Sequence, residues 1–204
     1  FTEAESTIRA LYFAEHLGAK IYIPHLSTRM ALDEVRRWRK RYDKVYVETC
    51  PHYLTHDEDS DLGGIGKANP PFRSADDVAA MWEGLADGSI DVVASDHVPR
   101  KRSTKEKPLW QASQGFPGTA TILPVLMDQG YHKGRLGLQR IAQLISGSPA
   151  SIFGLPQKGR VALGADADFA LVSPDFEREV KAAELGSFSD YSLYDGWRLR
   201  GWPR

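Results

Sequence analysis

Three short apolar segments recur along the first half of the chain, and each follows a stretch with helical periodicity. The apolar segments are residues 20–23, 44–47 and 90–94. The helices that we expect before them are residues 4–17, a segment capped by Ser27 or Thr28, and a segment that begins at Ser74 and ends before Gly88. Strands that are nearly continuously apolar and alternate with helices indicate a parallel sheet covered by helices. We therefore predict an α/β fold.

Polar side chains follow each of these predicted strands at the point where the strand ends. His25 follows the first strand, His52 the second, and Asp96 with His97 the third. In α/β barrels and in open doubly wound sheets, catalytic and ligand-binding residues lie at the edge formed by the carboxyl ends of the strands. A buried carboxylate is costly unless it is paired or bound to a metal. The position of Asp96 therefore indicates a functional site.

His25 on its own fits two interpretations, a hydrogen-bonded core histidine or a metal ligand. Together with Asp96 it places an imidazole and a carboxylate on neighbouring strands, a pair that suits zinc or a similar divalent ion. A catalytic zinc usually takes three protein ligands and a water, so these two residues cannot complete a site.

The predicted sheet favours a barrel segment over a dinucleotide-binding fold, because no G-x-G-x-x-G turn follows any of its strands. Three strands cannot close a barrel, so we expect most of it upstream of Phe1. The first helix should bury one apolar face, formed by Ile8, Leu11, Tyr12 and Leu17. Two further helices are predicted at about residues 119–129 and 138–145. We assign residues 1–155 to this barrel portion.

The last fifty residues have a different pattern. Two short β runs around a turn are predicted within residues 159–174, which suits a small β module beside the barrel. The tail, residues 187–204, is rich in Tyr, Trp and Gly and has little periodicity, so we expect an irregular packing segment. Residues 156–204 are therefore predicted to be part of a small β domain with a packing segment.

Composition excludes several classes of partner. The 26 basic and 27 acidic residues nearly balance, which argues against nucleic acid and against an anionic membrane surface. No apolar stretch approaches the roughly 20 residues that span a bilayer. The single cysteine, Cys50, rules out an internal disulfide framework and fits a reducing compartment, so we predict a cytoplasmic protein. Cys50 itself has no CxxC partner and is predicted to be structural.

Other polar residues fit both a functional and a structural interpretation. Asn69 precedes Pro70 and Pro71, so its loop is stiff and suits either a rigid connection or a substrate-holding segment. Arg100 belongs to a charged loop that is either solvated or reaches an anionic substrate group. We expect packing or hydrogen-bonding roles behind the site for His52 and His97. Surface positions are expected for the remaining histidines, which are His16, His56 and His132.

The sequence resembles the cyclic amidohydrolases, that is, dihydroorotases, hydantoinases (dihydropyrimidinases) and allantoinases. The matching motifs follow the family's order over nearly the whole chain. They are Ile23-Pro24-His25-Leu26-Ser27, Glu48-Thr49-Cys50-Pro51-His52-Tyr53-Leu54, Asn69-Pro70-Pro71-Phe72-Arg73, Ser95-Asp96-His97-Val98-Pro99, Gly115-Phe116-Pro117-Gly118, Lys158-Gly159-Arg160, Gly164-Ala165-Asp166-Ala167-Asp168, Tyr191-Ser192-Leu193-Tyr194-Asp195-Gly196-Trp197 and Gly201-Trp202-Pro203.

The resemblance implies the C-terminal part of a TIM-like (β/α)8 barrel with part of a small β domain, and a centre of two metal ions, usually zinc. His25 matches the metal ligand on the sixth barrel strand. Asp96 matches the aspartate on the eighth strand, which binds the other metal and takes the proton of the attacking hydroxide. Asn69 and the backbone around Gly115 and Phe116 match the substrate-holding loops.

The family's remaining ligands belong upstream of Phe1: a His-x-His pair, a carboxylated lysine and a histidine on the fifth strand. Dihydroorotases often carry a histidine four residues after the aspartate, where this chain has Arg100. Arginine is chemically capable of the same carboxylate recognition.

The activity that the resemblance implies is hydrolysis of a cyclic amide by the intact enzyme, this chain alone being an inactive fragment. The Asn-Pro-Pro loop favours a dihydroorotase-type substrate over those of hydantoinases, dihydropyrimidinases and allantoinases. A metal-free scaffold with the same fold is the non-enzymatic alternative, against which the presence of His25 and Asp96 argues. The expected partners are a small-molecule substrate and further copies of the intact chain, as a dimer or tetramer.

Overall fold

The first half of the chain folds around a parallel sheet in the order β1-β2-β3. A computed structural model describes residues 1–204. The strands are β1 (Ile21–Ile23), β2 (Val45–Thr49) and β3 (Val92–Val93). Ile21 lies opposite Val45, and Glu48 lies opposite Val92, both in parallel register. The predicted parallel sheet is confirmed.

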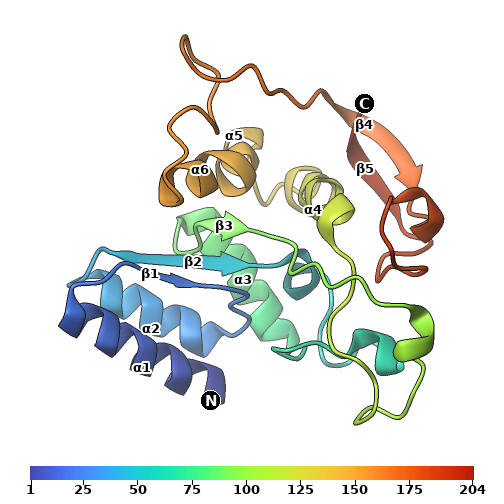
Figure 1. Cartoon of the computed structure of the whole chain (residues 1–204), viewed down its shortest axis with the longest axis horizontal. Helices are drawn as coiled ribbons and strands as arrows, with labels where there is room; N and C mark the ends of the chain where they lie inside the picture. The colour runs from blue at the N-terminus through green and yellow to red at the C-terminus, as the bar shows by residue number, and fades with distance from the viewer.

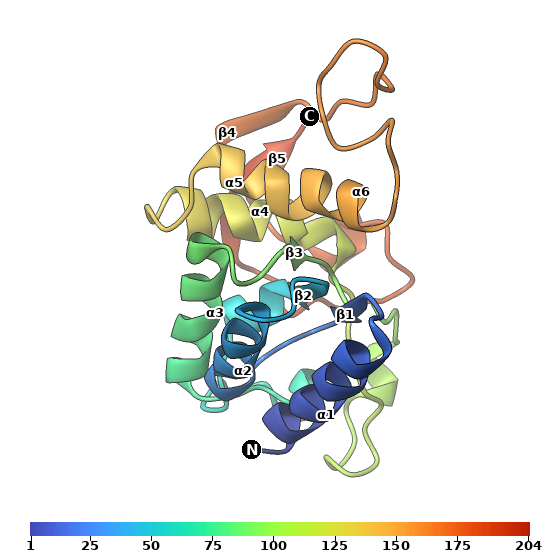
Figure 2. The same cartoon turned by 90° about the vertical axis from the view of Figure 1, so that its left-hand side faces the viewer.

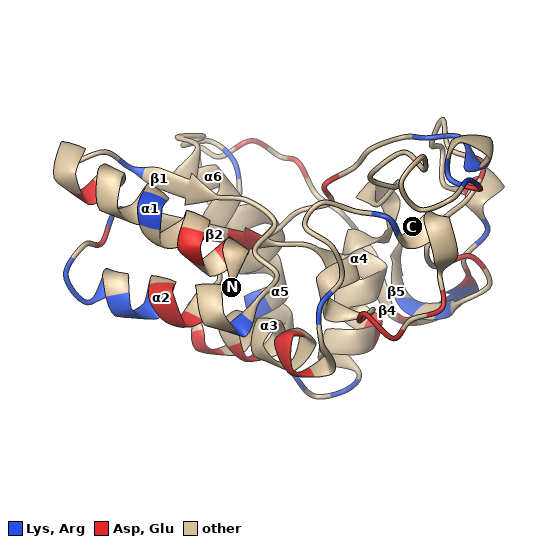
Figure 3. Cartoon of the chain, turned by 90° about the horizontal axis from the view of Figure 1, so that it is seen from below, with Lys and Arg blue, Asp and Glu red and all other residues tan.

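One side of this sheet is covered by the three helices that precede its strands (Figures 1 and 2). The helices are α1 (Thr2–Leu17), α2 (Arg29–Arg39) and α3 (Ala75–Asp87). Thr28 caps α2, and Ser74 forms a reciprocal capping box with Asp77 at the start of α3, as the sequence predicts. Acidic residues lie on all three helices, whereas Lys and Arg are found mainly on α2, which carries both signs (Figure 3).

The buried face of α1 differs from the predicted one. Leu11 is buried, but Tyr12 is 58% and Leu17 74% exposed, and Ile8 is also exposed. The buried positions are mostly small and recur at heptad spacing: Ala4, Thr7, Leu11 and Ala14. Small side chains let α1 pack closely against α2, which leaves the large apolar residues on the outer face.

The other side of the sheet is covered by helical segments from the second half of the chain. They are the 3-10 turn Thr119–Thr121, α4 (Ile122–Val125), the π-helical turn Leu126–Tyr131, α5 (Leu138–Ala142), the π-helical turn Gln143–Gly147 and α6 (Ser148–Ile152). This helical layer lies between the parallel sheet and a second sheet (Figure 2). Both predicted helices are therefore present, and the second extends beyond its predicted end. No helix of the structure combines the length and apolar character needed to cross a bilayer.

The second sheet corrects two sequence-based predictions. It is an antiparallel pair of β4 (Val172–Glu179) and β5 (Arg198–Pro203). Residues 159–171 form no strand, and Leu163 and Leu171 there are mostly exposed, so the predicted pair of β runs around a turn is wrong; only residues 172–174 of the predicted range are in a strand, as the start of β4. The tail is not irregular throughout, because β5 belongs to it. A Cβ on Gly201 would lie 2.2 Å from the Cβ of Met127, so this glycine permits the close approach of β5 to the helical layer.

His56 lies at the junction of two apolar clusters, where we expected a surface residue. It is only 6% exposed, and its ring lies within 6 Å of those of Phe72, Tyr194 and Trp197. Burial lowers the pKa of His56 to about 4. The neutral imidazole therefore belongs to the core that joins the C-terminal segment to the rest of the chain.

Acid should destabilise the fold through His56. Because its folded pKa, about 4, lies below its unfolded value, stability from this residue is complete above pH 6.5 and is lost as the pH falls toward 4. Between pH 7 and pH 5 we expect a loss of about 2 kcal/mol from this group, which His56→Gln should abolish. Urea unfolding of both proteins at the two pH values measures the difference. Equal pH dependence of both proteins would refute the assignment.

Glu3 ties α1 to two loops at the carboxyl edge of the sheet. Its carboxylate accepts hydrogen bonds from Ser27 N (2.7 Å), Ser27 Oγ (2.6 Å), Thr28 N (3.1 Å) and Arg73 Nη2 (3.0 Å). Ser27 follows β1, and Arg73 precedes α3. One partly buried carboxylate therefore aligns the loop after β1 with the loop before α3.

Replacement of Glu3 by glutamine should lower the free energy of unfolding by about 2 kcal/mol, because several charge-assisted hydrogen bonds are lost and Arg73 loses its ion pair. Glu5→Gln is the matched control on the same helix. The Glu5 side chain is 49% exposed, forms an ion pair with Arg9 and accepts one long hydrogen bond from Ser6 Oγ, so its replacement should cost less than about 0.5 kcal/mol. Denaturant titration of both variants compares them. Similar losses in the two would contradict the proposed bracing.

Candidate active site

The two predicted metal ligands lie just beyond the ends of β1 and β3. The three parallel strands run toward the same edge, from which the long loops emerge (Figure 1). His25 follows β1 by two residues, and Asp96 follows β3 by three. Parallel pairing in register brings both segments to one edge of the sheet.

Both residues have an unusual backbone conformation. His25 has φ of 41° and Asp96 has φ of 45°, and all other residues with positive φ in the structure are glycines. The left-handed region costs a non-glycine residue roughly 1–3 kcal/mol, and such strain clusters at functional sites. In this chain it is confined to the two residues that the sequence singles out as ligands.

The electrostatics of the site link the same two residues. Burial raises the pKa of the half-buried Asp96, and the nearby charge of His25 acts in the opposite direction. Burial also raises the pKa of the Cys50 thiol well above its usual value. A cysteine that stays protonated is a poor nucleophile, which agrees with the structural role predicted for it.

His52 lies in the 3-10 turn Pro51–Leu54 that follows β2. It is fully buried, its ring centroid lies 4.1 Å from that of Tyr53 and 4.7 Å from that of Phe116, and its Nε2 atom has no hydrogen-bond partner. Burial lowers the pKa of His52 to about 3. The packing role expected for this histidine agrees with these contacts.

Asn69 shares a cavity with His25. The cavity has a volume of about 490 Å³, and its lining includes Tyr22, His25, Asn69, Pro70 and Arg73. The Asn69–Pro70 peptide is cis, and Tyr53 Oη donates to the carbonyl oxygen of Pro70 at 2.6 Å. Asn69 and His25 therefore line one cavity, whose other walls come largely from α1 and β1 and whose lining does not include Asp96.

The loop at Gly115 and Phe116 directs most of its groups into the protein. Gly115 N donates to Lys67 O at 3.0 Å, and Gly115 has φ of 79° with Val98 against the position of a Cβ. The Phe116 side chain is 2% exposed, and its carbonyl oxygen accepts from Val98 N. What this loop can offer a substrate is backbone, and Gly115 contributes by shaping it.

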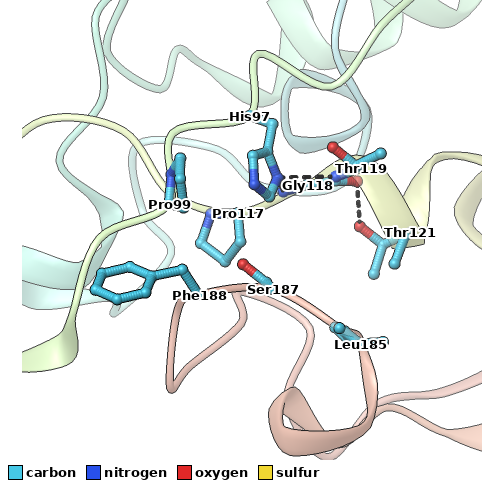
Figure 4. Close-up of a pocket in the computed structure, with 11 residues that line it drawn as sticks. His97, Pro99, Pro117, Gly118, Thr119, Thr121, Leu185, Ser187 and Phe188 are labelled. Atoms are coloured by element: carbon cyan, nitrogen blue, oxygen red, sulfur yellow. Dashed lines mark hydrogen bonds between the residues drawn. The ribbon is translucent and has the colours of Figure 1, made fainter.

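Arg100 and His97 lie apart from the His25 cavity. Arg100 is exposed, and no ion pair of the structure includes it. His97 is half-buried, and its Nδ1 atom accepts from Gly118 N at 3.2 Å and from Thr119 N at 3.4 Å. It lines a separate cavity of about 350 Å³ beside Pro117 and Phe188 (Figure 4). His97 thus supports the loop after Phe116, in line with its expected hydrogen-bonding role.

His25 and Asp96 carry donor atoms of the types that bind divalent metals. An imidazole and a carboxylate, held by strained backbone at one edge, are common ligands of zinc. They do not suffice in number, because the chain contains no group of three or more His, Cys, Asp or Glu residues that could hold an ion. His25 and Asp96 can therefore supply only part of a ligand set.

Comparison with solved structures identifies similar folds. An L-hydantoinase (dihydropyrimidinase) from Arthrobacter aurescens superposes with a TM-score of 0.93 at 32% identity, over 98% of this chain and 46% of the hydantoinase. A D-hydantoinase (dihydropyrimidinase) from a Thermus species gives a TM-score of 0.92 at 29% identity, with the same coverage. The chain thus shares the α/β fold of these hydantoinases, which are TIM-like barrels.

Sequence comparison gives the same grouping. A dihydroorotase of Halobacterium salinarum is 39% identical over 196 residues, which are 95% of this chain and 45% of the relative. An allantoinase of Escherichia coli is 37% identical over 177 residues, or 86% of this chain and 39% of the relative. The chain spans about half the length of the curated relatives it matches. The amidohydrolase family model matches residues 11–189, and the chain belongs to that family.

Proposed function

We propose that the protein containing this chain hydrolyses a C–N bond in the ring of a cyclic amide. The observation that carries the proposal is that the two expected metal ligands, His25 and Asp96, are also the only non-glycine residues with a positive φ. The relatives support it, since dihydroorotases, allantoinases and hydantoinases are all cyclic amide hydrolases.

Within that protein, residues 1–155 would be the C-terminal portion of the barrel and residues 156–204 part of a small β domain. A zinc pair would take His25 and Asp96 as ligands and the rest from elsewhere in the barrel. When bound, such a pair polarises the ring carbonyl and lowers the pKa of the attacking water. A homo-oligomeric, cytoplasmic enzyme remains our expectation.

Asp96 would move the proton during the reaction. Its carboxylate accepts a proton from the attacking water and delivers it to the leaving ring nitrogen as the C–N bond breaks. Asn69 would hold the substrate by its amide, since it lines the His25 cavity.

The favoured substrate is a cyclic amide that carries a carboxylate, such as dihydroorotate. Arg100 supports this choice because it is exposed and free of any ion pair in the structure. Burial raises the pKa of Tyr191 to about 12, and the charge of Arg100 acts in the opposite direction. Because the Tyr191 hydroxyl donates to Gly115 O, the Arg100 guanidinium is on the side of a predicted substrate loop. Hydantoin, dihydropyrimidine and allantoin remain the alternative substrates.

Assays of the zinc-loaded full-length protein that contains this chain, on dihydroorotate, dihydrouracil, hydantoin and allantoin, test the proposal. Dihydroorotate carries a carboxylate that dihydrouracil lacks. Arg100→Gln should therefore reduce kcat/KM for dihydroorotate by roughly tenfold or more and leave kcat/KM for dihydrouracil nearly unchanged. Turnover of none of the four would sink the proposed function. Equal effects of Arg100→Gln on both would remove Arg100 from substrate recognition.

Asp96→Asn should reduce turnover by about 100-fold or more, because a positioned proton-transfer group contributes about 10²–10⁴ to the rate. Asparagine tolerates the left-handed backbone region as aspartate does, so the fold should persist. Steady-state kinetics, with circular dichroism and the melting temperature as controls for folding, checks this expectation. A folded variant with most of its activity would refute the role of Asp96.

A further inference from the structure

Lys105 is a completely buried cation that the mechanism above does not use. Its side chain is 0% exposed, although burial of a charged group is costly unless its hydrogen bonds are satisfied. Its Nζ donates to three main-chain carbonyl oxygens, those of Lys67 (2.8 Å), Ser113 (2.8 Å) and Gly115 (2.9 Å). An ammonium has three N–H donors, so all of them are used.

The three carbonyls belong to the two loops that we assign to substrate binding. Lys67 lies two residues before Asn69, and Ser113 and Gly115 lie in the loop that reaches Phe116. The loops also meet directly, through Gly115 N and Lys67 O at 3.0 Å. Lys105 itself follows the 3-10 turn Arg102–Thr104, in the segment that leads from Asp96. Its ammonium therefore joins three segments of the carboxyl edge.

The surroundings hold this side chain in one place. A Cβ on Gly64 would lie 2.2 Å from Lys105 O, so the backbone at residues 64 and 105 is in close contact. The Phe116 ring centroid lies 5.7 Å from Nζ, within the range of a cation–π contact. Tyr191 Oη donates to the same Gly115 carbonyl at 3.3 Å. No salt bridge of the structure includes Lys105, so the neutral carbonyl dipoles are its main electrostatic support.

We propose that Lys105 is a positioning residue, whose ammonium fixes the Asn69 loop against the Gly115–Phe116 loop at the spacing that the substrate requires. The proposal rests on the proposed function only in that it takes these loops to hold the substrate. Lys105 acts through the loops and touches none of the reacting atoms. Its loss should therefore weaken substrate binding more than it slows the chemical step.

Lys105→Met tests this role, because methionine keeps an unbranched apolar stem and lacks the charge and all three donors. Lys107→Met is the matched control, since Lys107 is exposed two residues further along the same loop. We expect Lys105→Met to raise KM for the cyclic amide by roughly tenfold, with kcat changed much less, and Lys107→Met to change neither. A fall in kcat alone, or a wild-type KM, would overturn the proposal.

Amide hydrogen exchange tests the same role without any substrate. Lys105→Met should speed exchange by roughly tenfold or more at Gly115 and across residues 65–72 and 111–118, and leave α2 unchanged. Unchanged protection in both loops, or uniform loss throughout the protein, would overturn the positioning role. This readout remains decisive if the wild-type protein turns over none of the substrates, so the two proposals fail separately.

If Lys105→Met does not fold, Lys105→Gln takes its place, because its amide retains two N–H donors. Faster exchange in the same two loops is then expected, together with a smaller rise in KM. Wild-type exchange and wild-type KM in a folded Lys105→Gln variant would refute the requirement for the ammonium.

Discussion

Parallel pairing of β1, β2 and β3 is the constraint on which the rest of the structure depends. It sends all three strands in one direction, so that residues far apart in the chain leave the sheet at the same edge. His25 and Asp96 both lie at this edge, with β2 between the strands that they follow, although 71 positions separate them in the sequence. Helices cover both sides of the sheet and bury β2 and β3 more fully than β1, and they leave this edge to the loops. The sheet and its helices thus form a rigid scaffold, and the loops at this edge supply the catalytic and binding residues.

Much of the fold could be predicted because local signals and tertiary packing agree. The strands, the Thr28 cap and the Ser74 capping box are encoded within a few residues of where they act. The buried face of α1 could not be predicted from its large apolar residues, because close helix packing selects small ones. The pairing of β4 with β5 could not be predicted from local sequence patterns either, because residues near 175 pair with residues near 200.

The candidate site divides in the same way. His25, Asp96 and Asn69 could be predicted because each stands out against its neighbours, as a polar residue after an apolar strand or before a proline pair. Glu3 and Lys105 could not. Glu3 resembles any acidic residue in a first helical turn, and Lys105 lies within a run of charged residues that resembles a solvated loop. Their importance comes from burial and from partners distant in the chain.

The hydrogen bonds of Lys105 have a consequence for how the substrate pocket can change. All three acceptors are main-chain carbonyls, so the alignment of the two loops is indifferent to the side chains that those loops carry. Residues that face the substrate can then be exchanged without loosening the framework that presents them. A single scaffold can in this way bind cyclic substrates of different size and charge. The side chains of the loops recognise the substrate, and their main-chain carbonyls keep the two loops aligned.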